Sequence, residues 1–281
     1  MGREYRAYLL FTADKASPRR NAELFRRYVT VLAHSPRAWF RLRDCDALIR
    51  FTAAAALSSS DLDEVWFSDA EWEMLAELSA VLYDAIAFYK HRAEGETNNT
   101  FAYFPPDIRC DYYRQCRELL WALDAAWARN PAKLYVINFI RFFGGPIHMT
   151  MRRYRFVEED LTIGRPETES VVEQARQNFK LWNRVDAIVQ EAVNPKRYVD
   201  VISRESKLLF PGLATLLEEG GDGNCDSCLY QQSYGAETFG QFGGVQPCDD
   251  CKDMWKAFMK GVTARAIEVF PEILSYRHPK N

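Results

Sequence analysis

The fold is decided by one stretch of the chain, Ser68-Asp-Ala-Glu-Trp-Glu-Met-Leu-Ala-Glu-Leu-Ser-Ala-Val-Leu-Tyr-Asp-Ala-Ile86. Ser68 and Glu71, three residues apart, form the pattern of a capping box, in which two side chains close the first turn of a helix. Apolar side chains then recur at helical spacing. We therefore expect a helix over residues 69–92, with Asp84 inside its most apolar part.

Helical spacing recurs along most of the chain, and few segments alternate as strands do. A serine run at 58–60 marks one helix end. Asn130-Pro131 and Asn194-Pro195 mark two others, because the residue before proline avoids helical backbone angles. The further helices predicted are 21–33, 37–57, 108–129, 133–157, 167–193, 195–208 and 251–269. This pattern predicts an all-α fold.

Composition excludes several classes of protein. With 281 residues, 48% of them hydrophobic, the chain can bury a full core and is unlike a disordered protein. A net charge of −3 gives no sign of nucleic-acid binding. No run approaches the length of a membrane-spanning helix, and the N-terminus lacks the apolar segment of a signal peptide. We therefore expect a cytoplasmic protein without stable membrane insertion.

Four of the seven cysteines have the spacing of metal ligands. They form two Cys-x2-Cys pairs separated by residues 229–247, a spacing typical of a structural zinc site with four thiolates and no open position. The four are Cys225, Cys228, Cys248 and Cys251. The other three cysteines, which lie in predicted helices and are expected to be inert buried thiols, are Cys45, Cys110 and Cys116.

These observations predict two parts. Residues 1–210 would form an α-helical catalytic bundle, and residues 211–281 a small zinc-binding module with a C-terminal helix. Glycines at 220, 221 and 223 mark the start of the cysteine region. The chain begins with an apolar run at residues 8–11, as if an N-terminal part of the bundle were missing.

Three aspartates lie inside strongly apolar helical stretches: Asp46, Asp84 and Asp124. Burying a carboxylate costs several kcal/mol unless it is paired or bound to a metal. If the three face a common cavity, they could share a divalent cation. The alternative is a local ion pair for each, namely Asp46 with Arg50, Asp84 with Arg92 or His91, and Asp124 with Arg129. The two interpretations weigh equally for each residue alone, and we favour the shared cation for the set.

The segment after Asp84 adds further polar groups. It contains His91, Arg92, Glu94, Glu96 and Asn98 within eight residues. Carboxylates and amides bind hard cations through oxygen, whereas arginine and histidine bind phosphate oxygens. This mixture indicates a site for a metal-bound anionic substrate.

A second group of bases follows Arg141, in a very apolar helix that breaks at Gly-Gly-Pro (144–146). His148, Arg152 and Arg155 share one helical face by their spacing, which suits a diphosphate because guanidinium groups bind phosphate oxygens in pairs. The alternative is a solvated basic face paired with acidic residues 158 and 159. We favour the binding site because the helix break lies directly beside it.

Taken together, these residues resemble a known family, the fungal α-ionylideneethane synthases of abscisic acid biosynthesis, which are sesquiterpene synthases of secondary metabolism. The resemblance covers essentially the whole chain. It includes Tyr89-Lys-His-Arg-Ala-Glu-Gly-Glu-Thr-Asn-Asn-Thr-Phe-Ala-Tyr103 and Phe142-Phe-Gly-Gly-Pro-Ile-His-Met-Thr-Met-Arg-Arg-Tyr-Arg-Phe156. Further matching blocks are residues 12–17, 23–28, 43–46, 120–129 and 178–186, with the paired Cys-x2-Cys.

The resemblance implies a Mg²⁺-dependent lyase acting on farnesyl diphosphate. In this family the allylic diphosphate ionises, a linear triene forms, and cyclisation gives α-ionylideneethane. Family members also carry an additional N-terminal region that this chain is expected to lack.

Residue type and placement then suggest roles. Proton transfer is assigned to His91, His148, Glu94 and Glu96. Diphosphate binding is assigned to Arg92, Arg141, Arg152 and Arg155, and Mg²⁺ binding to Asp46, Asp84, Asp124 and Asn98; which carboxylates bind metal and which act as base stays open. The aromatic residues available to surround a carbocation are Phe88, Tyr89, Phe101, Tyr103, Trp121, Phe142 and Phe143.

Two alternatives remain at this point. One is a related synthase that makes another C15 hydrocarbon, since a few cavity side chains redirect a carbocation. The other is a non-catalytic, helical, zinc-containing interaction protein. An interaction scaffold has no need of internal aspartate, arginine and histidine, so these residues favour the enzyme.

Overall fold

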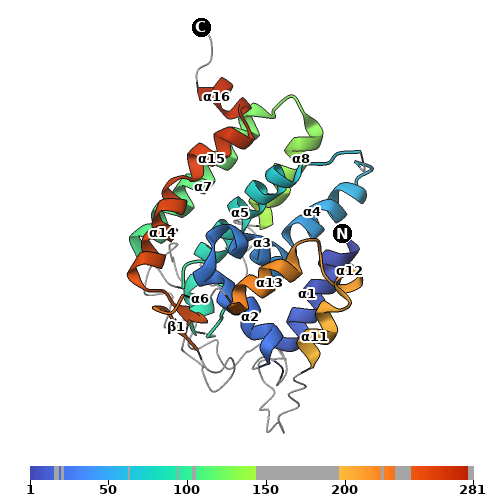
Figure 1. The fold of residues 1–281 in the computed structure, drawn as a ribbon. Coiled ribbons are helices and arrows are strands. Elements are labelled where there is room, and N and C mark those ends of the chain that lie inside the picture. The colour runs from blue at the N-terminus through green and yellow to red at the C-terminus, as the bar shows by residue number, and fades with distance from the viewer. Residues whose placement is uncertain are drawn as a thin grey trace.

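The structure is a computed structural model, and it describes residues 1–15, 19, 22–62, 64–93, 95–102, 106–143, 196–222, 225–231 and 242–277. These residues are mostly helical, with two short strands (Figure 1). The helical fold predicted from the periodicity is confirmed for this part of the chain. No helix among the described residues has the length and apolar character needed to cross a membrane.

Among the described residues up to 143, every regular element is a helix. These helices are α1 (Gly2–Lys15), α2 (Glu23–His34), α3 (Pro36–Ala47), α4 (Ile49–Ser58), α5 (Asp69–Ile86), α6 (Phe88–Ala93), α7 (Pro106–Ala126) and α8 (Pro131–Phe143).

The second half contains shorter helices and one hairpin. The helices are α11 (Arg197–Ile202), α12 (Glu205–Leu208), α13 (Leu213–Asp222), α14 (Asp249–Lys260), α15 (Val262–Val269) and α16 (Glu272–Arg277). Strand β1 (Leu229–Tyr230) pairs antiparallel with β2 (Val245–Gln246), and Tyr230 lies opposite Val245.

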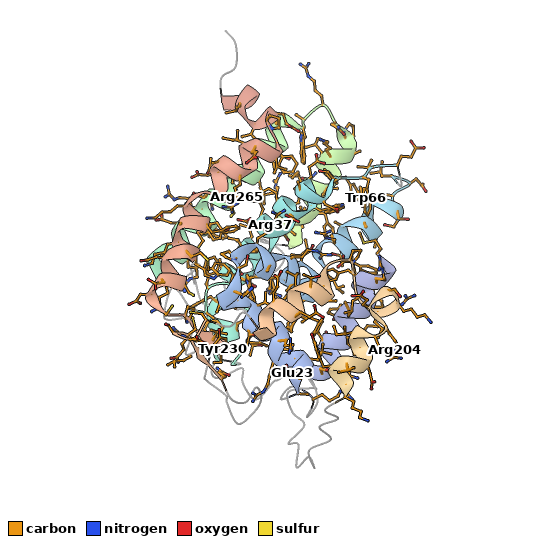
Figure 2. All side chains as sticks on the ribbon, viewed as in Figure 1. Glu23, Arg37, Trp66, Arg204, Tyr230 and Arg265 are labelled. Carbon is orange, nitrogen blue, oxygen red and sulfur yellow. The ribbon has the colours of Figure 1, made fainter. Side chains whose placement is uncertain are left out.

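Helix α5 is the centre of the molecule. Thirteen of its 18 residues are buried, as expected for a helix that packs against neighbours on all sides. It contacts α3, α4, α7, α8 and α15. Figure 1 shows α15 and α16 running beside α7. Arg265 of α15, which is labelled in Figure 2, donates from Nη2 to the carboxylate of Glu77 on α5. Side chains before and after residue 210 thus share one apolar core, which includes both Leu75 and Trp255.

The capping box predicted at the start of α5 is confirmed. Glu71 donates its backbone N–H to Oγ of Ser68 at 3.3 Å, and Ser68 donates its own N–H to the Glu71 carboxylate at 2.7 Å. These two bonds satisfy backbone groups that a helix start leaves without partners.

The helix predicted at 37–57 is in fact two helices, α3 and α4, separated at Leu48. Leu48 adopts the left-handed conformation (φ 56°), which ends α3. The carboxylate of Asp44 then accepts the backbone N–H of Arg50 at 2.9 Å, in the first turn of α4. A side chain of α3 therefore caps α4, and it offsets the cost of the break.

Other predicted helices also differ from the structure. The range 69–92 divides at Ala87 into α5 and α6, the range 195–208 into α11 and α12, and the range 251–269 at Gly261 into α14 and α15. Helices α1, α13 and α16 were not predicted. The predicted helix 167–193 and the part of 133–157 beyond Phe143 lie outside the described residues.

Helix α13 shows why two glycines were misleading. Gly220 and Gly221 were predicted to mark the start of the cysteine region, yet both lie inside helix α13. A Cβ at Gly220 would lie 2.9 Å from the carbonyl oxygen of Arg27, so only glycine allows α13 to approach α2 this closely. Glycine lowers the stability of a helix, and here the close packing of α13 on α2 offsets that loss.

The three cysteines outside the paired motif are not all buried. Cys45 and Cys116 are buried, as expected, whereas Cys110 is exposed. Cys110 lies in the second turn of α7, on its outer face, so the prediction of a buried thiol was wrong at that position.

Candidate active site

Arg43 of α3 lies at the centre of a buried ionic cluster. Its Nη2 donates to Oδ1 of Asp84 on α5 at 2.6 Å, and its Nε lies 3.2 and 3.3 Å from the two oxygens of the same carboxylate. Its Nη1 donates to Oδ2 of Asp46, one turn along α3. The two carboxylates raise the pKa of Arg43 well above its usual value, against the lowering effect of burial. Arg43 thus joins two of the three aspartates selected from the sequence.

Asp84 also fixes the loop that follows α6. Its Oδ2 accepts the backbone N–H of Thr100 at 2.9 Å and the Thr100 hydroxyl at 2.7 Å. The same hydroxyl accepts the indole N–H of Trp39 at 3.1 Å. Both oxygens of Asp84 are therefore already used by hydrogen bonds from Arg43 and Thr100, which satisfy this fully buried carboxylate.

Asn99 holds the His91 ring in one tautomer. The side-chain oxygen of Asn99 accepts the backbone N–H of Phe101 at 2.9 Å, and its amide nitrogen donates to the carbonyl of Asp84 at 3.0 Å. These two partners fix which end of the Asn99 amide is the nitrogen. That nitrogen is 2.9 Å from Nδ1 of His91, so the amide N–H donates and Nδ1 accepts. A neutral His91 must then carry its proton on Nε2.

Glu96 organises the start of the same loop. Its Oε1 accepts the backbone N–H groups of Thr97 at 2.9 Å and Asn98 at 3.2 Å, and it forms an ion pair with Lys15 of α1. Burial lowers the pKa of Lys15, but the carboxylates of Glu96 and Asp46 outweigh it, so the pKa is raised overall. The ammonium group therefore stays charged beside the loop.

Asn98 is buried against α2. Its amide nitrogen donates to the hydroxyl of Tyr28 at 3.4 Å, and its oxygen accepts the hydroxyl of Thr97 at 3.2 Å. Burial and the nearby Asp46 raise the pKa of Tyr28 well above its usual value, so this phenol stays protonated. Asn98 and Asp46 are the two predicted metal ligands that lie beside Tyr28.

Two arginines lie over the ring of Phe88 in α6. The guanidinium carbon of Arg109 is 3.7 Å from the ring centre, and that of Arg92 is 5.5 Å away. Arg109 is completely buried, and Arg92 is partly exposed. Phe88 is thus a cation-binding surface at the edge of the cluster.

Asp124 and Arg141 lie elsewhere. They pair with each other at 3.1 Å between α7 and α8, and both side chains are more than a third exposed. Among the described residues, the four cysteines are the sole group of three or more metal-ligating side chains close enough to hold one ion. The structure therefore brings Asp46 and Asp84 together through Arg43, and it does not bring Asp124 to them.

The local ion pairs considered as alternatives are not the ones that form. Arg50 pairs with Asp44 rather than with Asp46, and the charge partner of Asp84 is Arg43 rather than a residue further along its own segment. Asp124 pairs with Arg141, which comes from the next helix.

Several predicted residues lie outside what the structure describes: Glu94, His148, Arg152 and Arg155, and the side chains of Tyr89, Tyr103 and Phe143. Of the remaining aromatic candidates, Phe88 and Phe101 are buried beside the cluster. Trp121 and Phe142 are more than half exposed, which does not suit residues expected to line a dry cavity.

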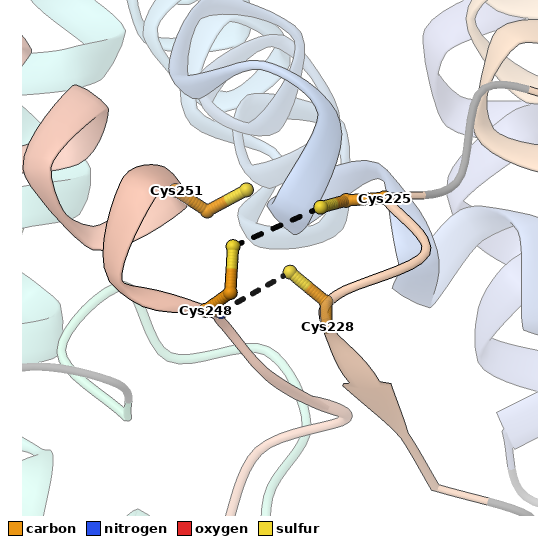
Figure 3. A group of neighbouring side chains, drawn as sticks. All are labelled: Cys225, Cys228, Cys248 and Cys251. Atoms are coloured by element: carbon orange, nitrogen blue, oxygen red, sulfur yellow. Dashed lines mark hydrogen bonds between the residues drawn. The ribbon is translucent and has the colours of Figure 1, made fainter.

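The four cysteines converge in space, although two of them come from a turn and two from the start of α14 (Figure 3). Their sulfur atoms all lie within 4.8 Å of one another. Sγ of Cys225 is 3.8 Å from Sγ of Cys248, and Sγ of Cys228 accepts the backbone N–H of Cys248 at 3.3 Å. This cluster could bind one metal ion.

The polypeptide around the cluster is built for close approach of these thiols. Cys228 donates its N–H to the carbonyl of Cys225 at 3.0 Å, which closes a tight turn before β1. Cys248 is the N-cap of α14, and Cys251 lies in the first turn. The N–H of Ser227 lowers the pKa of Cys225, whereas burial raises the pKa of Cys251.

Comparison with known proteins identifies the family of this chain. A sequence model of the family described as "Alpha-ionylideneethane synthase aba3" matches residues 1–272, nearly the whole chain. The chain belongs to this family.

Individual α-ionylideneethane synthases are close relatives. The chain is 62% identical to "Alpha-ionylideneethane synthase aba3" of Botryotinia fuckeliana (strain B05.10), over 98% of this chain and 63% of the relative. It is 59% identical to "Alpha-ionylideneethane synthase abl3" of Leptosphaeria maculans, over 97% of this chain and 64% of the relative. A protein of the same name from Pyricularia oryzae (strain Y34) is 45% identical over 98% of this chain and 64% of the relative. The chain therefore spans somewhat less than two thirds of the length of these family members.

Four residues of the candidate site were not predicted from the sequence: Lys15, Tyr28, Arg43 and Arg109. Arg43 had a signal, because it precedes Asp46 by three residues and so shares its helix face. Arg109 and Tyr28 had none, since their burial depends on how separate helices pack.

Proposed function

We propose that this protein is a sesquiterpene synthase that converts farnesyl diphosphate to α-ionylideneethane with loss of diphosphate, in abscisic acid biosynthesis. The observation that carries the proposal is the 62% identity, over 98% of this chain, to a relative named α-ionylideneethane synthase. A cytoplasmic location accompanies it, supported by thiols spaced for metal binding rather than for disulfides.

The ionic cluster suits the first step, departure of diphosphate. That step develops negative charge on phosphate oxygens, and it needs cationic donors in a site with little water. Lys15 and Arg92 border the loop at residues 95–102, and Arg43 is linked to it through Asp84, which accepts from Thr100. Two of the arginines predicted from the sequence to bind diphosphate lie within the described residues: Arg92 is at this loop, whereas Arg141 pairs with Asp124 between α7 and α8.

Mg²⁺ is the proposed cofactor, and Asp46 is the residue best suited to hold it. Proteins commonly bind this ion through one or two carboxylates, with substrate phosphates and waters completing the shell. Arg43 engages only Oδ2 of Asp46, so Oδ1 remains available, whereas the oxygens of Asp84 are saturated. When bound, the ion would neutralise charge on the diphosphate. Asp84 would act by holding Arg43 and Thr100 in place.

His91 is proposed as a hydrogen-bond donor rather than a base in the resting enzyme. Its Nδ1 accepts from Asn99, which leaves the proton on Nε2. A neutral imidazole in this tautomer donates a hydrogen bond from Nε2 to a phosphate oxygen and keeps its proton, because its N–H is too weak an acid to protonate the leaving group. The base that later removes a proton from the hydrocarbon would then be another group, for which Glu96 lies in the same loop.

The cysteine cluster is proposed to hold a structural Zn²⁺. In a tetrahedral thiolate site with Zn–S bonds of about 2.3 Å, neighbouring sulfur atoms are about 3.8 Å apart. The Cys225–Cys248 separation is 3.8 Å, and the remaining sulfurs lie within 4.8 Å. Four thiolates would leave no position open for water, so a catalytic role for this ion is not part of the proposal.

Incubation with farnesyl diphosphate and MgCl₂, followed by gas chromatography and mass spectrometry of a hexane extract, tests the proposal. The expected product is α-ionylideneethane, with none formed in EDTA. The full-length Botryotinia fuckeliana relative, treated identically, is the positive control. A different C15 hydrocarbon would support the related synthase instead. A folded, zinc-loaded chain that neither makes a hydrocarbon nor binds Mg²⁺-diphosphate would support the interaction protein.

A further inference from the structure

The hairpin next to the cysteine cluster touches the loop of the candidate active site. Gly243, just before β2, donates its backbone N–H to the carbonyl of Glu96 at 3.0 Å. The N–H of Glu96 in turn donates to the carbonyl of His91 at 2.9 Å. The peptide groups on both sides of Glu96 are therefore fixed, one by α6 and the other by the hairpin.

The position of Gly243 depends on β1 and the cysteines. Gln231 donates its N–H to the carbonyl of Gly244 at 3.1 Å, and its side chain donates to the carbonyl of Gly243. The preceding residue, Tyr230, accepts the backbone N–H of Cys225 at its hydroxyl at 3.0 Å. A continuous set of hydrogen bonds thus leads from the first cysteine to Glu96.

Two further contacts join the residues around the cysteine cluster to helices of the candidate active site. The ring of Phe242 meets the edge of Phe88, with centres 5.3 Å apart, and Phe88 carries the two arginines. Trp255 of α14 donates to the carbonyl of Leu32 at 3.0 Å on α2, the helix that contributes Tyr28. The part of the chain that contains the cysteine cluster therefore also contacts Phe88 of α6 and helix α2, both of which lie next to the loop at residues 95–102.

Gly243 also has a backbone conformation that few residues adopt. Its φ is 88°, in the region that favours glycine because a Cβ would clash with the backbone. Gly243 makes its bond to Glu96 in this conformation, so a side chain that strains the conformation is expected to weaken the bond.

We propose that Gly243 is a positioning residue through which the metal-loaded cysteine cluster holds the active-site loop at residues 95–102. Loss of the metal releases the hairpin, the bond from Gly243 to Glu96 is lost, and Lys15 and Asn98 lose their fixed positions. The affinity of the site for a diphosphate then falls. The identity of this ligand rests on the proposed function, whereas the coupling between hairpin and loop does not.

The test compares two glycine variants. Gly243→Ala strains the hairpin, and Gly212→Ala is the matched control, because Gly212 has a nearly identical φ of 85° with open space around its Cβ position. Each variant is measured for zinc content, thermal stability, hydrogen exchange of peptides covering residues 95–101, and affinity for inorganic diphosphate in MgCl₂.

We expect both variants to retain zinc. In Gly243→Ala the loop peptides should exchange about three- to tenfold faster, the range that loss of one net hydrogen bond gives, with weaker diphosphate binding. Gly212→Ala should change neither the exchange of the loop peptides nor the affinity for diphosphate. Gly243→Asn should restore part of the protection, because asparagine tolerates positive φ better than alanine. Cys225→Ser, which removes a metal ligand, should accelerate loop exchange in the same way.

Unchanged loop exchange in both Gly243→Ala and Cys225→Ser would overturn the proposal. Equal effects of Gly212→Ala and Gly243→Ala would also overturn it, because they would show a general loss of stability. If the loop responds as expected but farnesyl diphosphate gives no product, the positioning role stands and the proposed function fails.

Discussion

Arg43 and Asp84 form an ion pair across α3 and α5, with 2.6 Å between Nη2 and Oδ1, and their side chains are 4% and 0% exposed. A pair of charges this deeply buried is stable only because further hydrogen bonds satisfy both groups. Asp46 accepts a further hydrogen bond from Arg43, and Thr100 donates one to Asp84. The pair thus joins two core helices to the loop of the candidate site.

Replacing Arg43 should be strongly destabilising. Arg43→Met leaves Asp84 as an uncompensated buried charge, which costs about 3–5 kcal/mol. Urea unfolding followed by circular dichroism measures the loss. Arg37→Met removes an exposed arginine of the same helix and should cost under about 1 kcal/mol. A loss below 1 kcal/mol for Arg43→Met would mean that the cluster does not support the core.

Two of the predicted metal-binding aspartates should differ in their effect on activity. Asp46→Asn keeps the size of the side chain but removes the charge that Mg²⁺ needs, so product formation should fall by about a hundredfold or more. Asp124→Asn disturbs only an ion pair at a partly exposed position, and should keep activity within about twofold. Initial rates with farnesyl diphosphate at varied MgCl₂ distinguish them. Equal losses in the two variants would show that Asp124 belongs to the site after all.

Periodicity predicted the helices where local spacing is sufficient. The capping box at Ser68 and Glu71 is local and was found from sequence. The break at Leu48 depends on a carboxylate of one helix that caps the next, so spacing alone gave one helix where two exist. The apolar spacing of α13 was hidden by Gly220, whose reason lies in contact with Arg27 of α2.

The site was predictable in its residue types but not in its pairings. Cysteine spacing found the cluster, because each Cys-x2-Cys pair is local in sequence and two such pairs are typical of a metal site. Asp84 was correctly selected as a charge in an apolar helix. Its partner Arg43 is 41 residues away, and only the packing of α3 on α5 brings them together. Local pairing rules therefore assigned the wrong partners.

Glu77 should make stability depend on pH. Its carboxylate, buried in α5, accepts from the hydroxyl of Tyr112 and pairs with Arg265, yet burial raises its pKa above the usual 4.5. A raised pKa means that the folded state holds the proton more tightly. The stability from this group is therefore present below pH 4.5 and is lost as the pH rises through the folded pKa.

Comparison with Glu77→Gln isolates this contribution. The glutamine cannot ionise and has nearly the same shape, so the free energy of unfolding of the wild type should fall relative to that of the variant as pH rises from 4.5 toward 7. Urea titrations at several pH values measure the difference. Glu73→Gln, at a more exposed position on the same helix, is the control. A difference that grows in the opposite direction would show that Arg265 outweighs burial.

Removing one cysteine of the cluster should release the metal and loosen the chain around it, while the core helices stay folded. Cys225→Ser leaves three thiolates, so zinc content should fall from about one ion per chain to near zero. Residues 225–231 and 242–260 should then become sensitive to proteases, because a structural zinc ion contributes directly to local folding. Helix α5 should stay protected, since its core contacts with α3 and α7 do not involve the cysteines. Cys110→Ser removes an exposed thiol outside the cluster and should change neither zinc nor cleavage. Zinc retained in full by Cys225→Ser would mean that the converging sulfurs do not form the metal site.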